Sequence, residues 1–304
     1  GVDYLLIGKV RWEKGEGDKS RVRVSPELIQ VSTGSTKWQQ PFDANLTDVF
    51  QVQADVAGRV AEALDVALGA GQKQALAERP TGNIAAYDAY LHGEEVTGGM
   101  SVGDPATLRR AVDYYQQAVA LDSGFALAWA QLSRAYSTIY GNGVPAPETA
   151  TAARRAADRS LALAPSRAEG RLALAEYYRL VERDNERTLE QATLGQRTTP
   201  GNADLIVVGS LAEQNLGRWS EALEHLRQAR QLDPRSAQTA RRLGTCLLFL
   251  RRYPEALEAY DYTMSLAPTN VTALEFKAMV FLAQGDLAGA RTVPRSAPGI
   301  EPAS

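Results

Sequence analysis

Residues 219–234 read Trp-Ser-Glu-Ala-Leu-Glu-His-Leu-Arg-Gln-Ala-Arg-Gln-Leu-Asp-Pro, and the pattern in this stretch recurs along the chain. Ala222, Leu226 and Ala229 are spaced so that they share one face of a helix. Small side chains on that face let a second helix pack closely. Pro234 ends the helix, because proline lacks the amide donor and clashes with the preceding turn. The stretch therefore predicts one helix of a closely packed pair.

The same register repeats about every 34 residues. Prolines recur at positions 165, 200, 234 and 268, with spacings of 35, 34 and 34 residues. The other copies of the stripe are Ala111, Tyr115 and Ala118; Ala153, Ala157 and Ser160; Thr188, Ala192 and Gly195; and Ala256, Tyr260 and Thr263. Partner helices follow each stop, with patterns such as Trp129, Leu132, Ser133 and Tyr136, or Leu243, Gly244 and Leu247. Because one such pair cannot bury its apolar face alone, the repeats predict a stack of helix pairs.

Two helices per 34 residues, with this alternation of small and large residues, resemble the tetratricopeptide repeat. The resemblance covers roughly residues 83–292 and departs at Arg171 and Ile206, where an aromatic residue is usual. It implies a mainly α fold, a tetratricopeptide-repeat superhelix (α-solenoid) of about five to six repeats. Such a solenoid has a concave groove lined mainly by the first helix of each pair, which is suited to binding a protein or peptide.

The amino-terminal residues follow a different period. Residues 4–12, 22–31 and 37–40 read as strands, with a hairpin loop at 14–20 and a turn at 32–35. A helical pattern then runs from Asp48 through Leu68. Three strands and a long helix predict a small α+β domain before the solenoid.

Residues 1–10, 44–53 and 83–91 carry a second resemblance. They are similar to the TolB-like amino-terminal domain found before tetratricopeptide repeats in bacterial kinases, adenylate cyclases and transcription regulators. In that family a strand and a helix normally precede the residue that matches Gly1, so we expect a truncated carboxy-terminal portion. The resemblance implies a regulatory or sensory appendage, often on a catalytic parent.

These patterns predict three segments. Residues 1–75 form the truncated TolB-like domain, residues 76–292 the solenoid, and residues 293–304 an irregular tail. The tail carries Pro294, Pro298 and Pro302, so its composition cannot form another repeat.

Composition excludes several classes of function. The net charge of −3 and the isoelectric point near 5.6 argue against nucleic-acid binding, which normally needs a basic face. No run of about 18 apolar residues occurs, so we expect no direct membrane insertion. No residue decides between a cytoplasmic location and an extracytoplasmic one beyond a membrane anchor in a parent protein.

We expect no catalytic site, no metal site and no cofactor. The two histidines, His92 and His225, lie in repeat helices, where packing or surface roles are expected. No pair of His, Cys or carboxylate residues has metal-ligand spacing. The single cysteine, Cys246, lies among leucines and reads as a buried small hydrophobe. A hydrolase is a weak alternative, because the Gly-Xaa-Ser-Xaa-Gly elbow is absent.

The groove is the better candidate for a binding site. Arginine there can fork onto a partner carboxylate. In repeat register, the residues on or near the inward helices are Arg134, Glu176, Arg179, Gln214, Gln238, Arg241 and Arg242. The lysine–asparagine pattern of the chaperone-tail carboxylate clamp is absent from this register, so binding of chaperone carboxyl termini is not expected.

A regulatory module that self-assembles is the alternative function. A truncated sheet leaves an open edge, and exposed strand edges invite pairing with another chain. This alternative predicts a homodimer through residues 1–40, the adjacent helix or an uncapped solenoid end.

Overall fold

The computed structural model describes residues 3–13, 21–45, 49–64, 79–98, 104–143 and 145–293. Contacts divide the chain into two compact units, Gly1–Ile84 and Ala85–Ser304. The predicted domain boundary at residues 75 and 76, the predicted hairpin loop at 14–20 and almost all of the predicted tail lie outside the described residues.

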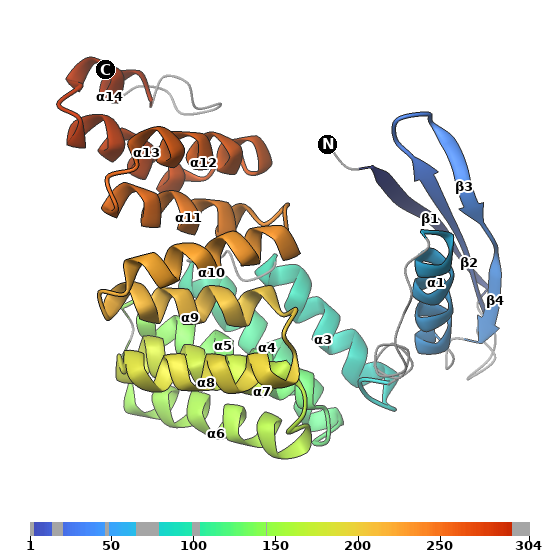
Figure 1. Ribbon diagram of the computed structural model, residues 1–304. Coiled ribbons are helices and arrows are strands. Elements are labelled where there is room, and N and C mark those ends of the chain that lie inside the picture. Colours follow the sequence, from blue (N-terminus) through green and yellow to red (C-terminus); the bar gives the residue numbers. More distant parts are fainter. Residues whose placement is uncertain are drawn as a thin grey trace. The chain divides into compact units, whose positions relative to one another are not determined.

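The described residues of the first unit form an antiparallel sheet with one helix, as predicted, and Figure 1 shows the helix beside the sheet. Strand β2 (Arg21–Gln30) pairs along its whole length with β1 (Tyr4–Glu13). On its other side, β2 pairs first with β4 (Phe42–Asn45) and then with β3 (Ser35–Gln39). Strand β4 was not predicted from the sequence.

One face of β2 forms the small core of this unit. Val22, Pro26 and Leu28 are buried at alternating positions, as expected for a strand with one covered face. Helix α1 (Val49–Ala63) packs against β2, β3 and β4, and its Val52 is buried. The described helix ends at Ala63, before the predicted Leu68, and residues 65–78 are outside the description.

The second unit is a tetratricopeptide-repeat solenoid, and its described helices follow one another as antiparallel pairs (Figure 1). The pairs are α3 (Ile84–Thr97) with α4 (Pro105–Leu121), α5 (Ala126–Gly141) with α6 (Pro147–Leu163), α7 (Ala168–Tyr177) with α8 (Asn185–Thr198), α9 (Ala203–Asn215) with α10 (Trp219–Leu232), α11 (Ala237–Phe249) with α12 (Tyr253–Leu266), and α13 (Val271–Ala283) with α14 (Leu287–Thr292). A π-helical segment, Tyr178–Glu182, continues α7. The predicted fold class is confirmed.

The predicted stripe of small residues forms the seam between helices. In α10, Ala222, Leu226 and Ala229 are fully buried, and the matching residues of α4, α6, α8 and α12 are buried as well. Gly244 of α11 shows how tight the seam is, because a Cβ atom there would lie 2.8 Å from Cε1 of Tyr260. This spacing explains why the repeat needs small residues at fixed positions.

Glycines and capping side chains shape the turns and the starts of the solenoid helices. Gly217 and Gly285 both have φ of +79°, in the left-handed region that favours glycine after a helix end. Side chains of Asp184, Asn202 and Ser236 accept hydrogen bonds from backbone amides at the starts of α8, α9 and α11. Across the described residues, we find no helix that combines the length and the apolar character needed to cross a membrane.

Candidate partner-binding groove

The inward helices of the solenoid line a groove with a volume of about 700 Å³. Its walls come from the first helices of four pairs, namely α5, α7 with the π-helical segment, α11 and α13, and from the turn before α13. The lining residues are Arg134, Thr138, Asn142, Glu176, Arg179, Leu180, Ala237, Gln238, Arg241, Arg242, Ala267, Thr269, Asn270, Val271 and Thr272. The groove therefore joins residues more than 130 positions apart in the sequence.

The structure brings together six of the seven residues predicted to face the groove. Arg134, Glu176, Arg179, Gln238, Arg241 and Arg242 all line it. Gln214 of α9 does not; it is 9% exposed, and its Nε2 atom is buried without a hydrogen-bond partner. The whole of α9 is absent from the lining, although it is the first helix of its pair.

Arg134 and Glu176 form a two-point ion pair between α5 and α7. Nε of Arg134 lies 3.1 Å from Oε2 of Glu176, and Nη2 lies 3.3 Å from Oε1. Each side chain is only 15% exposed. Burial alone would raise the pKa of Glu176, but the charges of Arg134 and Arg179 and the hydrogen bond from Arg134 hold it below its usual value.

This pair continues into a polar network that reaches α3 and α4. Nη1 of Arg134 donates to Oε1 of Gln131 at 3.0 Å, and Nε2 of Gln131 donates to Oε1 of Glu94 at 2.8 Å. The same Glu94 oxygen accepts from the hydroxyl of Tyr115 at 2.7 Å. Burial, followed by this hydrogen bond, raises the pKa of Tyr115 far above its usual value. The network ties α3, α4, α5 and α7 together.

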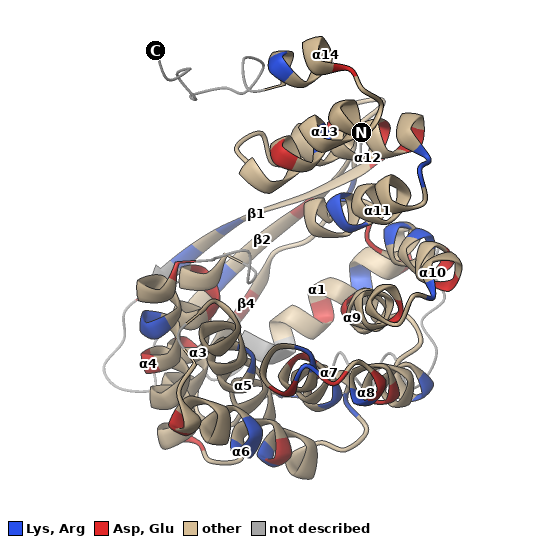
Figure 2. Cartoon of the chain, turned by 90° about the vertical axis from the view of Figure 1, so that its left-hand side faces the viewer, with Lys and Arg blue, Asp and Glu red and all other residues tan. Residues whose placement is uncertain are grey.

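The other three groove arginines differ from Arg134. Within the part of the chain that the structure describes, no carboxylate lies within 4.0 Å of the guanidinium groups of Arg179, Arg241 and Arg242. The Nε atoms of Arg179 and Arg242 are buried and have no hydrogen-bond partner. Burial lowers the pKa of all three arginines, and the charges of Arg241 and Arg179 lower that of Arg242 further. Figure 2 shows basic residues on α11, which carries two of them.

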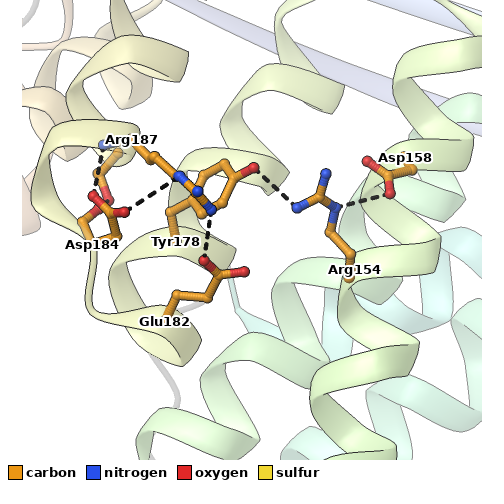
Figure 3. Close-up of polar contacts among 7 residues, drawn as sticks. Arg154, Asp158, Tyr178, Glu182, Asp184 and Arg187 are labelled. Atoms are coloured by element: carbon orange, nitrogen blue, oxygen red, sulfur yellow. Dashed lines mark hydrogen bonds and ion pairs between the residues drawn. The ribbon is translucent and has the colours of Figure 1, made fainter.

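The π-helical segment places Arg179 in the groove. It ends at Arg183, whose φ of +57° is left-handed and is unusual for a residue other than glycine. Tyr178 anchors the segment, because Nη1 of Arg154 donates to its hydroxyl at 3.0 Å (Figure 3). The guanidinium carbons of Arg154 and Arg187 lie 5.4 and 5.5 Å from the centroid of the Tyr178 ring. Short π-helical segments occur frequently at functional sites.

Ion pairs also position the two arginines that contact Tyr178, and one of these pairs reaches the segment itself at Glu182. Arg154 also pairs with Asp158 at 2.8 Å, and Arg187 pairs with Glu182 at 3.1 Å and with Asp184 at 3.4 Å (Figure 3). These side chains are about one-third or more exposed, so each pair alone stabilises the fold only weakly. Their combined effect is to hold Tyr178 and its neighbour Arg179 in one arrangement.

Sequence reasoning missed the neutral part of the groove. Thr138 lies one turn after Arg134 on α5, and its spacing of four residues was a usable signal. Ala267, Thr269 and Asn270 lie between α12 and α13, where helix register gives no guidance, and Val271 and Thr272 begin α13. These residues add hydroxyl, amide and aliphatic surface around the arginines.

The histidines and the cysteine make local contacts away from the groove lining. Nδ1 of His225 lies 2.8 Å from Oε2 of Glu213, and Nδ1 of His92 lies 2.9 Å from the carbonyl oxygen of Asp88. Cys246 is buried as predicted, and burial raises the pKa of its thiol to about 11. Among the described residues, no three His, Cys, Asp or Glu side chains cluster in a way that could hold a metal ion.

Comparison with known proteins supports the repeat assignment. The family model described as tetratricopeptide repeat matches residues 210–270 and 247–303. The thermophilic tetratricopeptide-repeat protein TTC0263 of Thermus thermophilus has a TM-score of 0.55 and 20% identity, and the match covers 65% of this chain and 100% of that one. The APC/C hetero-tetramer Cut9–Hcn1 has a TM-score of 0.57 and 15% identity, over 85% of this chain and 52% of that one. At these identities the likeness shows a shared fold.

One curated relative is named as an enzyme. The protein named "Putative adenylate cyclase 3" of Rhizobium meliloti (strain 1021) is 29% identical over 133 residues. The match covers 44% of this chain, and it spans only about 21% of the length of that relative. The similarity therefore concerns a small part of the longer protein.

Proposed function

We propose that this chain is a non-catalytic protein–protein interaction scaffold, which binds a partner peptide or domain in the groove of its solenoid. The observation that carries the proposal is the groove itself, with its volume of about 700 Å³ and its lining from α5, α7, α11 and α13. Extended concave surfaces are what solenoids use for binding. The mixed lining supports a polypeptide ligand, because it offers charged, amide and aliphatic groups side by side.

Rigid support of the lining also favours binding. The network from Tyr115 to Glu176 holds two groove residues in place through hydrogen bonds of 2.7–3.3 Å. A pre-organised surface loses less conformational freedom when a ligand binds, so more of the interaction energy appears as affinity.

The test is selection from a library of displayed random dodecapeptides with the full chain as bait. Two matched variants are compared. Thr272→Trp fills the groove at an exposed lining position, and Gln228→Trp adds the same bulk at an exposed position of α10, outside the groove. Selected peptides are expected to bind the wild type and Gln228→Trp but not Thr272→Trp. If every selected peptide still binds Thr272→Trp, or if no peptide is selected, the groove is refuted as a binding site.

The absence of catalysis has its own test. The curated relative supplies the most relevant reaction, conversion of ATP to cyclic AMP, and an ester panel covers the hydrolase alternative. Incubation of the full chain with ATP and Mg²⁺ should give no cyclic AMP, and the esters should remain intact. Turnover that co-purifies with the chain and disappears on mutation of a residue in it would contradict the proposal.

The amino-terminal unit supports a regulatory setting for the scaffold. We assign residues 1–75 to a TolB-like domain, and the antiparallel sheet with α1 packed on it is consistent with that assignment. In this view the solenoid supplies protein binding in a regulatory setting, which agrees with its match to a small part of a cyclase-named relative.

Self-association is the second candidate function. Strand β1 pairs only with β2 among the described strands, and its Leu6, Ile7 and Val10 are 44–51% exposed. The occupant would be the β1 edge of a second copy, because unpaired edges accept another strand. Light scattering over a concentration series should then show a dimer that Ile7→Lys dissociates and Val31→Lys does not. A monomer at all concentrations would rule this candidate out.

A further inference from the structure

The groove carries unbalanced positive charge. Its charged lining consists of four arginines and one glutamate, and Arg134 already engages both oxygens of that glutamate. In the described part of the chain, Arg179, Arg241 and Arg242 have no carboxylate within 4.0 Å, and only the more distant charge of Glu176 acts on Arg179. This is opposite to the character of the whole chain, whose net charge is −3.

Such an arrangement lowers the stability of the fold when the groove is empty. Buried polar groups are normally hydrogen-bonded, yet the Nε atoms of Arg179 and Arg242 have no partner. Removing charged groups from water costs free energy, and their mutual repulsion adds to that cost. The repulsion falls when an anion enters the groove beside the guanidinium groups and accepts hydrogen bonds from their exposed N–H groups.

We propose that Arg179, Arg241 and Arg242 form a subsite that binds carboxylate groups of an acidic segment in the partner peptide. This inference rests on the proposed function, since it specifies which peptide the groove accepts. Each guanidinium group offers donors in a planar fork that matches a carboxylate. The Arg134–Glu176 pair shows that this groove accommodates such two-point contacts.

The ligand is a peptide segment and not a single small anion. A volume of about 700 Å³ is many times that of one carboxylate, and Thr138, Gln238 and Thr269 provide neutral polar lining beyond the arginines. Nucleic acid is disfavoured, because three local guanidinium groups on a net acidic chain do not make the extended basic face that it needs.

The subsite is also held ready before the ligand arrives. Arg241 and Arg242 are consecutive on α11, while Arg179 comes from the π-helical segment that Tyr178 anchors. Donors from two separate elements surround the same space, so one carboxylate-bearing segment can contact both.

The experiment repeats the dodecapeptide selection with the full chain and adds charge-removing variants. Arg241→Gln/Arg242→Gln removes two donors, and Arg235→Gln removes an exposed arginine that does not line the groove. Thermal melting of each variant checks folding. The double variant should fold at least as well as the wild type, because the change relieves repulsion.

Selected peptides should be enriched in Asp and Glu. The affinity of these peptides should fall by about tenfold or more for the double variant. It should fall by a similar factor when the acidic residues of the peptides are replaced by their amides. For Arg235→Gln the affinity should change less than twofold. If the selected peptides are neutral, fail to bind Thr272→Trp and still bind the double variant, this inference is overturned and the proposed function stands. The absence of any groove-dependent peptide would overturn both.

Discussion

Arg134 of α5 and Glu176 of α7 are joined by two N···O contacts of 3.1 and 3.3 Å on the inner face of the solenoid. The pair couples neighbouring repeats at a position that also lines the groove. It uses one arginine of the groove for structure and, in our proposal, leaves the other three for binding. Several measurements can separate these two roles.

Glu176→Gln should lower the free energy of unfolding by about 3 kcal/mol, because removal of one partner leaves the other charge buried and unpaired. Urea unfolding followed by circular dichroism measures this change. Asp158→Asn is the matched control, since its pair with Arg154 is 39–51% exposed and should contribute about 1 kcal/mol or less. Equal losses in the two variants would contradict the structural role of Arg134–Glu176.

Acid should weaken the same pair. The folded-state pKa of Glu176 lies below its ordinary value of 4.5, so its stabilising contribution is complete above pH 4.5 and is lost as pH falls through the folded-state pKa. The stability difference between wild type and Glu176→Gln should therefore shrink as pH falls below 4.5. Unfolding curves at several pH values test this, and a difference independent of pH would exclude the assignment.

Arg242→Met should raise the free energy of unfolding at pH 7 by about 1 kcal/mol or more. Burial and the charges of Arg241 and Arg179 depress the pKa of Arg242, so its charged form destabilises the fold at neutral pH. Methionine keeps the apolar stem and removes the charge. Arg134→Met is the contrasting variant and should lower stability, because Arg134 is paired. A loss of stability in both would show that Arg242 also has a structural partner.

Gly244→Ala tests the close packing of α11 on α12. The added methyl group would lie 2.8 Å from Cε1 of Tyr260, a fully buried ring, so we expect a loss of about 1–3 kcal/mol. Gly201→Ala is the control, because a methyl group added there would have no atom within 4 Å, and it should change stability by about 0.5 kcal/mol or less. The measurement is thermal unfolding, and a harmless Gly244→Ala would mean that the helices are farther apart.

Tyr178 variants test how the π-helical segment is held. Tyr178→Phe removes the hydroxyl that accepts from Arg154 but keeps the ring near Arg154 and Arg187, so it should cost about 1 kcal/mol. Tyr178→Leu also removes the ring and should cost more. Hydrogen exchange at residues 178–183 should increase in the same order. Unchanged exchange in Tyr178→Leu would show that other contacts fix the segment.

The repeat fold could be predicted because its physical signal is local and periodic. Ala222, Leu226 and Ala229 lie at helical spacing, and every copy of this stripe is buried. Strand β4 escaped prediction because Phe42–Asn45 is only four residues long and follows Pro41, so it offers too few alternating positions.

The candidate groove was predictable in part for the same reason. Arg134, Arg241 and Arg242 follow from helix register, whereas the π-helical segment at Tyr178–Glu182 shifts the register without a sequence signal. Gln214 was predicted to face the groove, but it is buried in α9, a helix that contributes no lining residue. Which arginines acquire a partner depends on packing between repeats, which no single helix encodes.

Site-specific photo-crosslinking tests the central claim most directly. Benzoylphenylalanine is placed at Gln238 in the groove or at exposed Glu224 on α10, and the full chain is irradiated with the biotinylated random peptide pool. Crosslinking at position 238 that unlabelled selected peptide suppresses, with little at position 224, is the predicted result. Equal crosslinking at both positions, or competition only at position 224, would contradict the assignment of the groove as the binding site.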